Sequence, residues 1–470
     1  MNRHTLVPGP LFFIVLFLNF FSAAAGELVV YPTPKEVLYS HHNDDFTVRV
    51  RKPGGEWMDL YEYKVEVDMD NPAIASMVGF DFSEKVEVQV KKNNGDINSV
   101  KVRPLSYGIS PVVKGNTITF SLTEPRYLSV EFNGDKLRNL HVFANGLETM
   151  KPLPSDPDVV WFGPGVHKPA DGKGFRISSG KTVYLAAGAI LRGKLIIDSV
   201  SNVRIIGRGM IEKADRGIEV TNSDNVLIDG ITVVNPVHYS IYGGSSRNMT
   251  ISNFKSFSSR GWSDGIDLMS CSDVNINRIF MRNSDDCIAI YTHRWDFYGS
   301  ARNYIISNAV LWADIAHTTN IGLHGNTDAV GDTIENILFK DIDILEHDED
   351  DTDYQGAMAL SVGDLNLVRN IRYENVRVEN FQEGQLFSLR LFFNEKYNTG
   401  PGRSIENILF KNISYTGDNN YTSVIDGLDK DHMVKDVTFE NLTINGKKIL
   451  NAKDGNIRIG KFTGNIRFKP

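Results

Sequence analysis

Three aspartates provide the chemistry that stands out in this sequence. Asp285 and Asp286 lie side by side in the segment NSDDCIAIY, residues 283–291, and apolar residues follow them at once. Asp264 precedes them by 21 and 22 residues, in the segment GWSDGIDLMS. Adjacent like charges repel, and a carboxylate beside an apolar strand is costly to desolvate. If the three carboxyl groups share one patch, one of them stays protonated near neutral pH while another acts as a base.

Other interpretations of these aspartates are a turn, a solvated bend or part of a calcium site. We favour catalysis for the three together, with no metal and no cofactor, and expect a structural role for Asp267 alone. His324 lies in the segment TNIGLHGNTD, between Gly322 and Gly325, where the backbone can approach a ligand closely. We therefore expect His324 to contribute to the same site.

A repeat in the second part of the chain predicts how these residues are positioned. An Asn/Asp-apolar-x-apolar unit recurs every 20 to 37 residues, which is typical of a solenoid. Short β-rich units at this interval predict a parallel β-helix, in which asparagines at one turn form a hydrogen-bonded ladder. Asp264 then lies almost one coil before the Asp pair, on the same face. The units begin at Asn202, Asn225, Asn248, Asp273, Asn303, Asn336, Asn370, Asn407, Asp436 and Asn456.

The earlier part of the chain has a different pattern. Residues 26–150 contain runs in which apolar and polar residues alternate, such as FTVRV at 46–50 and VEVQV at 86–90, separated by turn signals. They predict an N-terminal β-sandwich. Prolines at 152, 154 and 157 mark the boundary with a β-helix over residues 151–470. We therefore predict an all-β protein, a right-handed parallel β-helix preceded by a β-sandwich.

The N-terminal residues 1–25 have the features of a cleaved signal peptide. A basic start precedes an apolar run at 11–21 and small residues at 23–25, and the run is short for a membrane span. We expect a secreted or periplasmic protein with no membrane span. Cys271 and Cys287 are its two cysteines, and they either pair or remain buried thiols. The net charge of −8 and the lack of a basic, aromatic patch argue against a nucleic-acid partner.

The motifs resemble those of a clan of glycoside hydrolases. SDGIDL, SDDCIAI and GLHG are similar to the Asn-Thr-Asp-Gly, Gly-Asp-Asp-Cys-Ile-Ala and Gly-His-Gly motifs of the polygalacturonases, family 28. The β-sandwich in front of the β-helix instead resembles family 49, the dextranases and isopullulanases. The segments KTVYLAAGAILRGKL at 181–195 and VLWADIAHTTNIGLHGNT at 310–327 are similar to that family as well. The resemblance spans nearly the whole chain after residue 25.

The resemblance implies an inverting hydrolase. Asp285 would be the general acid, and Asp264 and Asp286 would hold and deprotonate the attacking water, which agrees with the need for one raised and one ordinary pKa. His324 would support the acid or the sugar at the cleaved bond. Trp312 falls where family 49 has a Trp-containing strand, and we expect it to bind substrate. Trp295, in the loop after the Asp pair, offers a ring for stacking on a sugar.

The sequence departs from family 28 at one substrate-binding motif. The Arg-Ile-Lys of polygalacturonases falls at SLRLFF, which keeps Arg390 but has Phe392 in place of the lysine. That lysine helps to bind the galacturonate carboxylate. The acidic run EHDEDDTDY at 346–354 would also disfavour a polyanionic chain. We therefore favour an α-glucan of the dextran or pullulan type, with pectin as the alternative substrate. A β-helix polysaccharide lyase and a non-catalytic carbohydrate-binding protein are less favoured.

Overall fold

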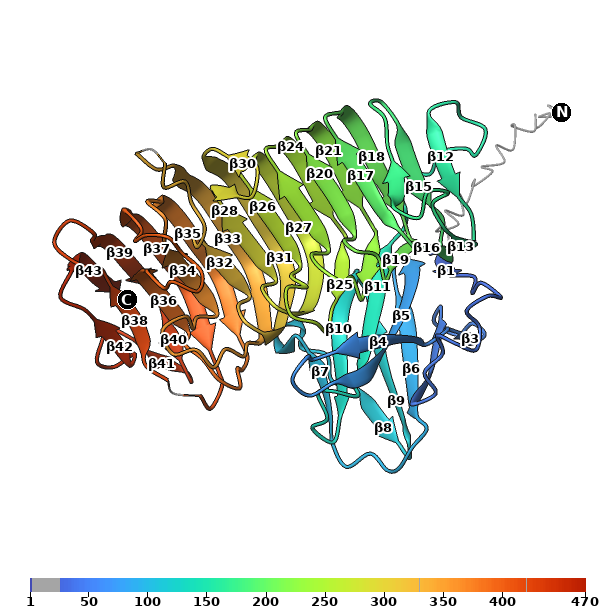
Figure 1. Cartoon of the computed structure of the whole chain (residues 1–470). Helices are drawn as coiled ribbons and strands as arrows, with labels where there is room; N and C mark the ends of the chain where they lie inside the picture. The colour runs from blue at the N-terminus through green and yellow to red at the C-terminus, as the bar shows by residue number, and fades with distance from the viewer. Residues whose placement is uncertain (2–25, 329, 420) are drawn as a thin grey trace.

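Two β-rich parts make up the protein in a computed structural model that describes residues 1, 26–328, 330–419 and 421–470 (Figure 1). The predicted signal peptide falls almost wholly outside the described residues. The predicted all-β class and the right-handed parallel β-helix are confirmed. One short 3-10 helix, η1, spans Leu105–Tyr107. No helix among the described residues is both long enough and apolar enough to cross a membrane.

The N-terminal part is a sandwich of two sheets. The apolar residues of its strands alternate, so one face of each sheet is buried in a shared core that includes Val48, Val88 and Val130. One sheet has β1 (Leu28–Val30), β4 (Tyr63–Val67), β5 (Ala73–Phe82), β7 (Val100–Arg103), β10 (Arg126–Phe132) and β11 (Leu140–Gly146). The other has β2 (Phe46–Arg51), β3 (Met58–Asp59), β6 (Val86–Lys92), β8 (Val112–Lys114) and β9 (Thr117–Leu122).

The second part is the β-helix, whose coils stack from β12 to β43 (Figure 1). Its 11-stranded parallel sheet, which we call the groove sheet, carries the site described below. Inward side chains such as Ile266, Ile288 and Leu268 fill the core of the β-helix. The groove sheet has β14 (Gly174–Arg176), β17 (Lys194–Asp198), β20 (Ile218–Thr221), β23 (Ile241–Gly244), β26 (Ile266–Met269), β28 (Ile288–Tyr291), β32 (Thr319–Ile321), β34 (Met358–Val362), β36 (Phe387–Leu391), β38 (Ser423–Asp426) and β42 (Ile457–Ile459).

A 19-stranded sheet closes the other sides of the β-helix. Its strands are β12 (Val159–Phe162), β13 (Gly165–His167), β15 (Thr182–Leu185), β16 (Ala189–Leu191), β18 (Ser201–Gly207), β19 (Met210–Glu212), β21 (Asp224–Asp229), β22 (Thr232–Val234), β24 (Arg247–Ser252), β25 (Lys255–Phe257), β27 (Ser272–Ser284), β31 (Ala301–Ile315), β33 (Thr333–Glu346), β35 (Leu367–Val378), β37 (Ser404–Tyr415), β39 (Val434–Glu440), β40 (Thr443–Ile444), β41 (Lys447–Lys448) and β43 (Thr463–Lys469). A hairpin of β29 (His293–Arg294) and β30 (Phe297–Tyr298) projects after β28.

The predicted asparagine ladder is present, but one of its predicted members, Asn456, does not belong to it. Ladder residues have a left-handed backbone, which Asn and Asp tolerate, and their amides donate to the preceding coil. Asn336 Nδ2, for example, donates to Asn303 Oδ1 at 3.2 Å and its Oδ1 accepts from Asn370. Asp436, however, is followed on the next coil by Asn465 and not by Asn456, because β39 pairs with β43.

The sandwich contacts the β-helix beside the strand that leads to the Asp pair. The loop between β4 and β5 donates two backbone hydrogen bonds, from Met69 N to Ser284 Oγ at 3.0 Å and from Asp68 N to Asp314 Oδ2 at 3.1 Å. Ser284 is the last residue of β27 and directly precedes Asp285. The sandwich therefore helps to position the turn that carries the carboxyl groups.

Candidate active site

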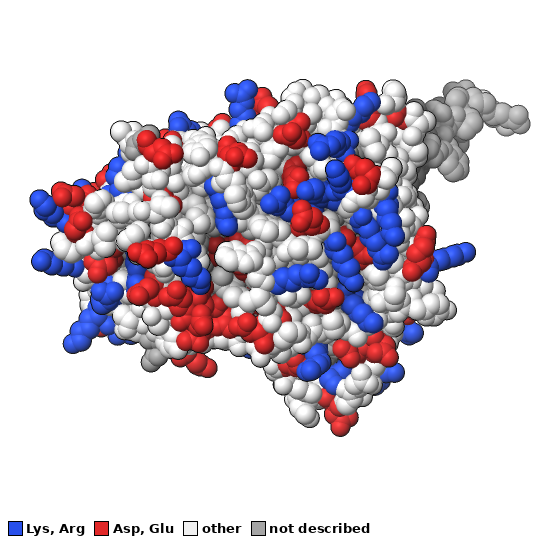
Figure 2. Space-filling view, in the orientation of Figure 1, with Lys and Arg blue, Asp and Glu red and all other residues white. Residues whose placement is uncertain are grey.

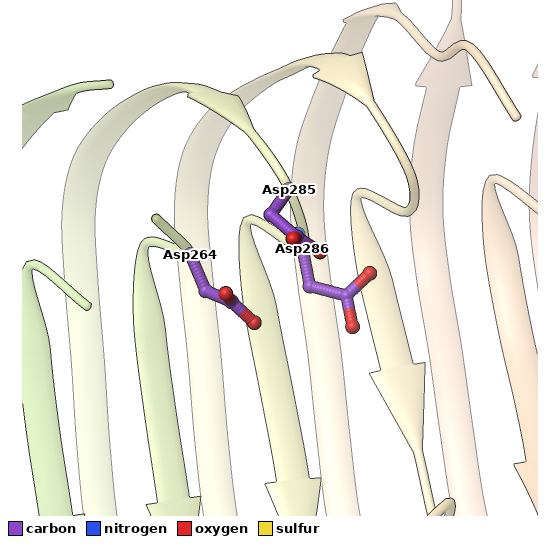
Figure 3. A group of neighbouring side chains, drawn as sticks. All are labelled: Asp264, Asp285 and Asp286. Atoms are coloured by element: carbon purple, nitrogen blue, oxygen red, sulfur yellow. The ribbon is translucent and has the colours of Figure 1, made fainter. Parts of the chain in front are cut away.

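The three aspartates lie on neighbouring coils at the entrance to the groove sheet. Asp264 precedes β26 by two residues, and Asp285 and Asp286 connect β27 to β28. Because β26 and β28 pair in parallel, with Ile266 opposite Ile288, the turns before these strands are adjacent. One oxygen of each carboxyl group lies within 4.8 Å of the others (Figure 3). The structure therefore brings together the three aspartates, as their spacing along the repeat predicts.

The close approach of two coils explains why a glycine, Gly265, follows Asp264. A Cβ atom on Gly265 would collide with the carbonyl oxygen of Cys287 and with Met281 Cε. The backbone of the two coils therefore approaches closely at this point, and this approach brings Asp264 next to the Asp pair.

Asp286 is held in its ionised form by a buried histidine. His317 Nδ1 lies 2.6 Å from Asp286 Oδ1, and Asn320 Nδ2 donates to Asp286 Oδ2 at 2.8 Å. Burial raises the pKa of Asp286, but the charge of His317 and the hydrogen bonds from both residues outweigh it and lower the pKa. The second ring nitrogen of His317 faces the carbonyl oxygen of Tyr354, so both nitrogens donate. Burial lowers the pKa of His317, but the charge and the hydrogen bond of Asp286 together oppose this effect and raise the pKa to about 9.

Asp285 is the most accessible of the three carboxyl groups and has the opposite electrostatic balance. Burial and the negative charge of Asp286 raise the pKa of Asp285 to about 6. Its carboxylate accepts backbone hydrogen bonds from Trp262 N at 2.8 Å and from Asp286 N at 3.1 Å. These contacts orient the group and limit the rise of its pKa.

Asp264 has a second buried carboxyl group beside it. Asp267 in β26 is fully buried on the outer face of the groove sheet, and it has no hydrogen-bond partner besides Asp264 among the described residues. Burial and the neighbouring carboxylates raise the pKa of Asp264, and burial does the same for Asp267. The cluster therefore has four carboxyl groups, one more than we predicted, and it retains protons.

The oxygen positions fit one water molecule between carboxyl groups. A water that donates hydrogen bonds of about 2.8 Å to two oxygens spans roughly 4.5 Å between them. One oxygen of each group lies within 4.8 Å of the others, so one water can reach two of these groups at once. This spacing is closer than the roughly 6.5–9.5 Å typical of the two carboxyl groups of inverting glycosidases.

The three clustered carboxyl groups are also the one set among the described residues with a geometry that could hold a metal ion. Burial and the neighbouring carboxylates raise the pKa of Asp264 and Asp285, so a cation would compete with protons for these oxygens. Cys271 and Cys287 are buried free thiols in the core of the β-helix and do not pair.

Two of the predicted substrate-binding residues are partly exposed beside the coils that carry the aspartates. His324 is half-buried and packs edge-on against Tyr291, with ring centres 4.9 Å apart. Burial and Arg294 lower the pKa of His324 to about 3, so the ring is neutral. Trp295 is 43% exposed in the β29–β30 hairpin, 5.5 Å from the ring of Tyr242 and 4.6 Å from the guanidinium of Arg294.

The other two predicted binding residues have partners within the protein. Arg390 in β36 pairs with Asp353 at 2.9 Å, so a neighbouring carboxylate balances its charge. Trp312 is 2% exposed, packs against the sandwich and lies 4.1 Å from the guanidinium of Arg282. These contacts leave the ring of Trp312 no free face for a sugar, so this placement does not support the predicted binding role.

Sequence reasoning missed His317, Asn320, Tyr354 and Arg294. His317 follows Asp286 by 31 residues, close to the local coil length of 30 residues between Asp273 and Asn303. That spacing is the signal that could have identified it. Tyr354 belongs to the acidic run, and its hydroxyl accepts from Asn320 Nδ2 at 2.7 Å. Tyr354 of this run therefore contacts both residues that hold Asp286, His317 and Asn320.

Acidic residues gather where the β-helix meets the loop between β4 and β5 of the sandwich. Asp348 of the acidic run pairs as an isolated β-bridge with Glu383. Burial, Glu383 and the sandwich residues Asp68 and Asp70 raise the pKa of Asp348 to about 7. Figure 2 shows acidic side chains gathered along this lower edge of the β-helix, next to the sandwich. A negatively charged substrate would be repelled there.

The fold is similar to those of solved polysaccharide hydrolases. Dex49A from Penicillium minioluteum aligns with a TM-score of 0.69 and 16% identity over 94% of this chain and 96% of its own. A family 28 exopolygalacturonase from Yersinia enterocolitica aligns with a TM-score of 0.51 and 12% identity, over 83% of this chain and 98% of its own. At these identities the likeness concerns the fold.

Two fungal sequences each match just under half of the chain. Probable endopolygalacturonase D of Neosartorya fischeri is 24% identical over 235 residues, 48% of this chain and 43% of its own length. Probable exopolygalacturonase B of the same fungus is 22% identical over 215 residues, 43% of this chain and 45% of its own length. The chain thus matches less than half of the length of these relatives. The model of the glycosyl hydrolases family 28 matches residues 171–459, more than half of the 470-residue chain, and the protein belongs to that family.

Proposed function

We propose that the protein hydrolyses an α-linked polysaccharide with inversion at the anomeric carbon. One observation carries the proposal: Asp286, held ionised by His317, adjoins Asp285, whose pKa is raised to about 6. A base and a proton donor side by side are what glycoside hydrolysis requires. A non-catalytic carbohydrate-binding protein would not need this pair, and a lyase would need a Lys or Arg base in its place.

In the proposed reaction, Asp285 protonates the glycosidic oxygen while the bond from this oxygen to the anomeric carbon breaks. A water held by Asp264 and Asp286 attacks the carbon from the opposite face, and Asp286 takes its proton. The proton that Asp285 gives up is thus matched by the one that Asp286 gains. Exchange with solvent restores both groups. The inverting outcome rests on the family resemblance, and the anomer formed first, observed by NMR, tests it.

An α-glucan of the dextran or pullulan type is the substrate that we favour. Arg390 is already paired with Asp353, and Phe392 is buried against Tyr354 in place of a lysine. Neither residue offers a free positive charge to a uronate carboxylate. The acidic side chains gathered along the lower edge of the β-helix also favour a neutral chain over a polyanion (Figure 2).

Polygalacturonate is the second candidate, and Arg294 favours it. This half-buried guanidinium lies among the rings of Trp295, Tyr239 and Tyr291. It forms no ion pair within 4 Å among the described residues, although the charges of Asp267 and Asp264 act on it. A uronate carboxylate would find a free cationic partner there. The relatives named as polygalacturonases support the same candidate.

Incubation with dextran, pullulan and polygalacturonate separates the candidates. We expect reducing ends to appear without the ultraviolet absorbance of an unsaturated uronide, and the polymer that responds identifies the substrate. Absorbance with cleavage would mean a lyase, and binding without cleavage would mean a carbohydrate-binding protein. We also propose that the protein is exported, which N-terminal sequencing of the protein recovered outside the cells would test.

A further inference from the structure

We infer that Trp262 binds the sugar on the leaving-group side of the cleaved bond, an inference that rests on the proposed hydrolase function. Trp262 is 58% exposed, although it is a large aromatic residue. Its backbone N–H donates to Asp285 Oδ2 at 2.8 Å. An exposed indole thus adjoins the group that contacts the leaving oxygen.

The backbone of Trp262 is in an unfavourable conformation that the surrounding turn maintains. Its φ of 64° is in the left-handed region, which is unfavourable for any residue with a side chain. Arg260 N donates to Ser263 Oγ at 3.2 Å, and Ser258 Oγ donates to the carbonyl of Ser263. Asn283 Nδ2, in the strand that leads to Asp285, donates to Ser258 Oγ at 2.9 Å. These bonds hold the turn in register with the proton donor.

Trp262 and Trp295 are two exposed tryptophans in the coils that carry the carboxyl cluster. Trp262 precedes β26, whereas Trp295 follows β28 in the β29–β30 hairpin and also has a positive φ, 54°. Two exposed aromatic residues with a positive φ in the coils of the carboxyl cluster indicate a binding function, because neither ring contributes to the core. The apolar face of a sugar ring packs well against indole.

The side of the bond follows from the contact with Asp285. Its Oδ2 receives the N–H of Trp262, so the carboxyl group that protonates the leaving oxygen lies directly beside this residue. Met69 of the sandwich adjoins the same turn, since a Cβ on Gly261 would lie 3.4 Å from Met69 Sδ. The sugar that departs with the protonated oxygen therefore meets a surface formed by Trp262, with Met69 behind its turn.

Trp262→Gly is the decisive variant, because glycine accepts the positive φ and keeps the N–H that contacts Asp285. Trp262→Phe retains a stacking ring, and Tyr39→Ala, an exposed sandwich residue, is the matched control. Kinetics are measured with whichever of dextran, pullulan or polygalacturonate the wild type cleaves. Binding is measured by retardation in gels containing each polymer.

We expect Trp262→Gly to lower kcat/KM about tenfold and to weaken retardation, with the alkaline limb of the pH profile unmoved. Trp262→Phe should remain within about threefold of the wild type, and Tyr39→Ala should match it. Unchanged kcat/KM and retardation in Trp262→Gly would overturn the inference while an active wild type upholds the proposed function. A shifted alkaline limb would show an effect through Asp285 and would also overturn it. An inactive wild type would overturn the proposed function, and retardation would then decide alone on Trp262.

Discussion

At the scale of single residues, Asp285 carries the proposed proton donation. Asp285→Asn keeps the size of the side chain and one of the two backbone hydrogen bonds, because its amide has a single acceptor oxygen, and it cannot protonate the glycosidic oxygen. We expect kcat to fall about 1,000-fold, within the range for loss of a general acid, with an unchanged melting temperature. Asp328→Asn, an exposed loop residue near the groove, is the control. Wild-type rates in Asp285→Asn would exclude the assigned role.

His317 determines the protonation of the base, and the pH profile reports on it. Activity needs Asp286 ionised and Asp285 protonated, so it should rise through the lowered pKa of Asp286 and decline above about pH 6. In His317→Gln the positive charge is lost, so the pKa of Asp286 rises. We expect the acidic limb to move up by about one pH unit and kcat to fall.

His324→Gln is the matched histidine variant. The ring of His324 is neutral and contacts Tyr291, so its loss should change KM while the acidic limb stays in place. If both variants moved the acidic limb equally, the assignment of His317 as the partner of Asp286 would fail.

At the scale of elements, the asparagine ladder maintains the turn of each coil. Asn336 donates to Asn303 and accepts from Asn370, and its φ is 59°. Asn336→Ala loses both bonds, each worth about 1 kcal/mol, and places alanine in a left-handed conformation. Asn336→Gly loses the bonds but tolerates the conformation. We expect urea denaturation to give a larger loss of stability for alanine than for glycine; equal values would mean that the backbone conformation contributes nothing.

The repeat also explains which parts of the site the sequence could predict. Coil spacing relates residues on neighbouring turns, so it placed Asp264 beside the Asp pair. The same rule applied to the 31 residues from Asp286 would have found His317. The glycine-flanked motif predicted His324, and not His317, as the histidine of the site. Asn456 entered the predicted ladder because its neighbours resemble a repeat unit, whereas strand pairing selects Asn465.

At the scale of the whole molecule, contacts between the two parts are what the sequence did not reveal. The repeat identifies which side chains point outward from the β-helix, but it does not show which other part of the protein covers them. Trp312 lies on an outer face that the sandwich buries, so an aromatic residue expected to bind sugar is part of an internal interface. The β4–β5 loop of the sandwich also contacts Ser284, next to Asp285. The sandwich is therefore part of the structure that supports the site.

This interface contains buried charges, and its stability can be tested at Arg282. The fully buried guanidinium pairs with Asp314 at 2.9 Å and donates to Asn139 of the sandwich at 2.9 Å. Arg282→Ala leaves the carboxylate of Asp314 buried without its cation, which costs roughly 3–5 kcal/mol. We expect the melting temperature to fall by several degrees and activity to fall with it, because Asp314 also anchors the loop at Asp68.

Arg247→Ala is the control for Arg282, because it removes an exposed pair with Asp224. An exposed pair contributes at most about 1 kcal/mol, so this variant should melt near the wild type. The double variant Arg282→Met with Asp314→Leu removes both charges and should recover most of the lost stability. If the double variant were as unstable as Arg282→Ala, the penalty would come from lost packing rather than from the unpaired carboxylate, and the interface would be held together mainly by its apolar contacts.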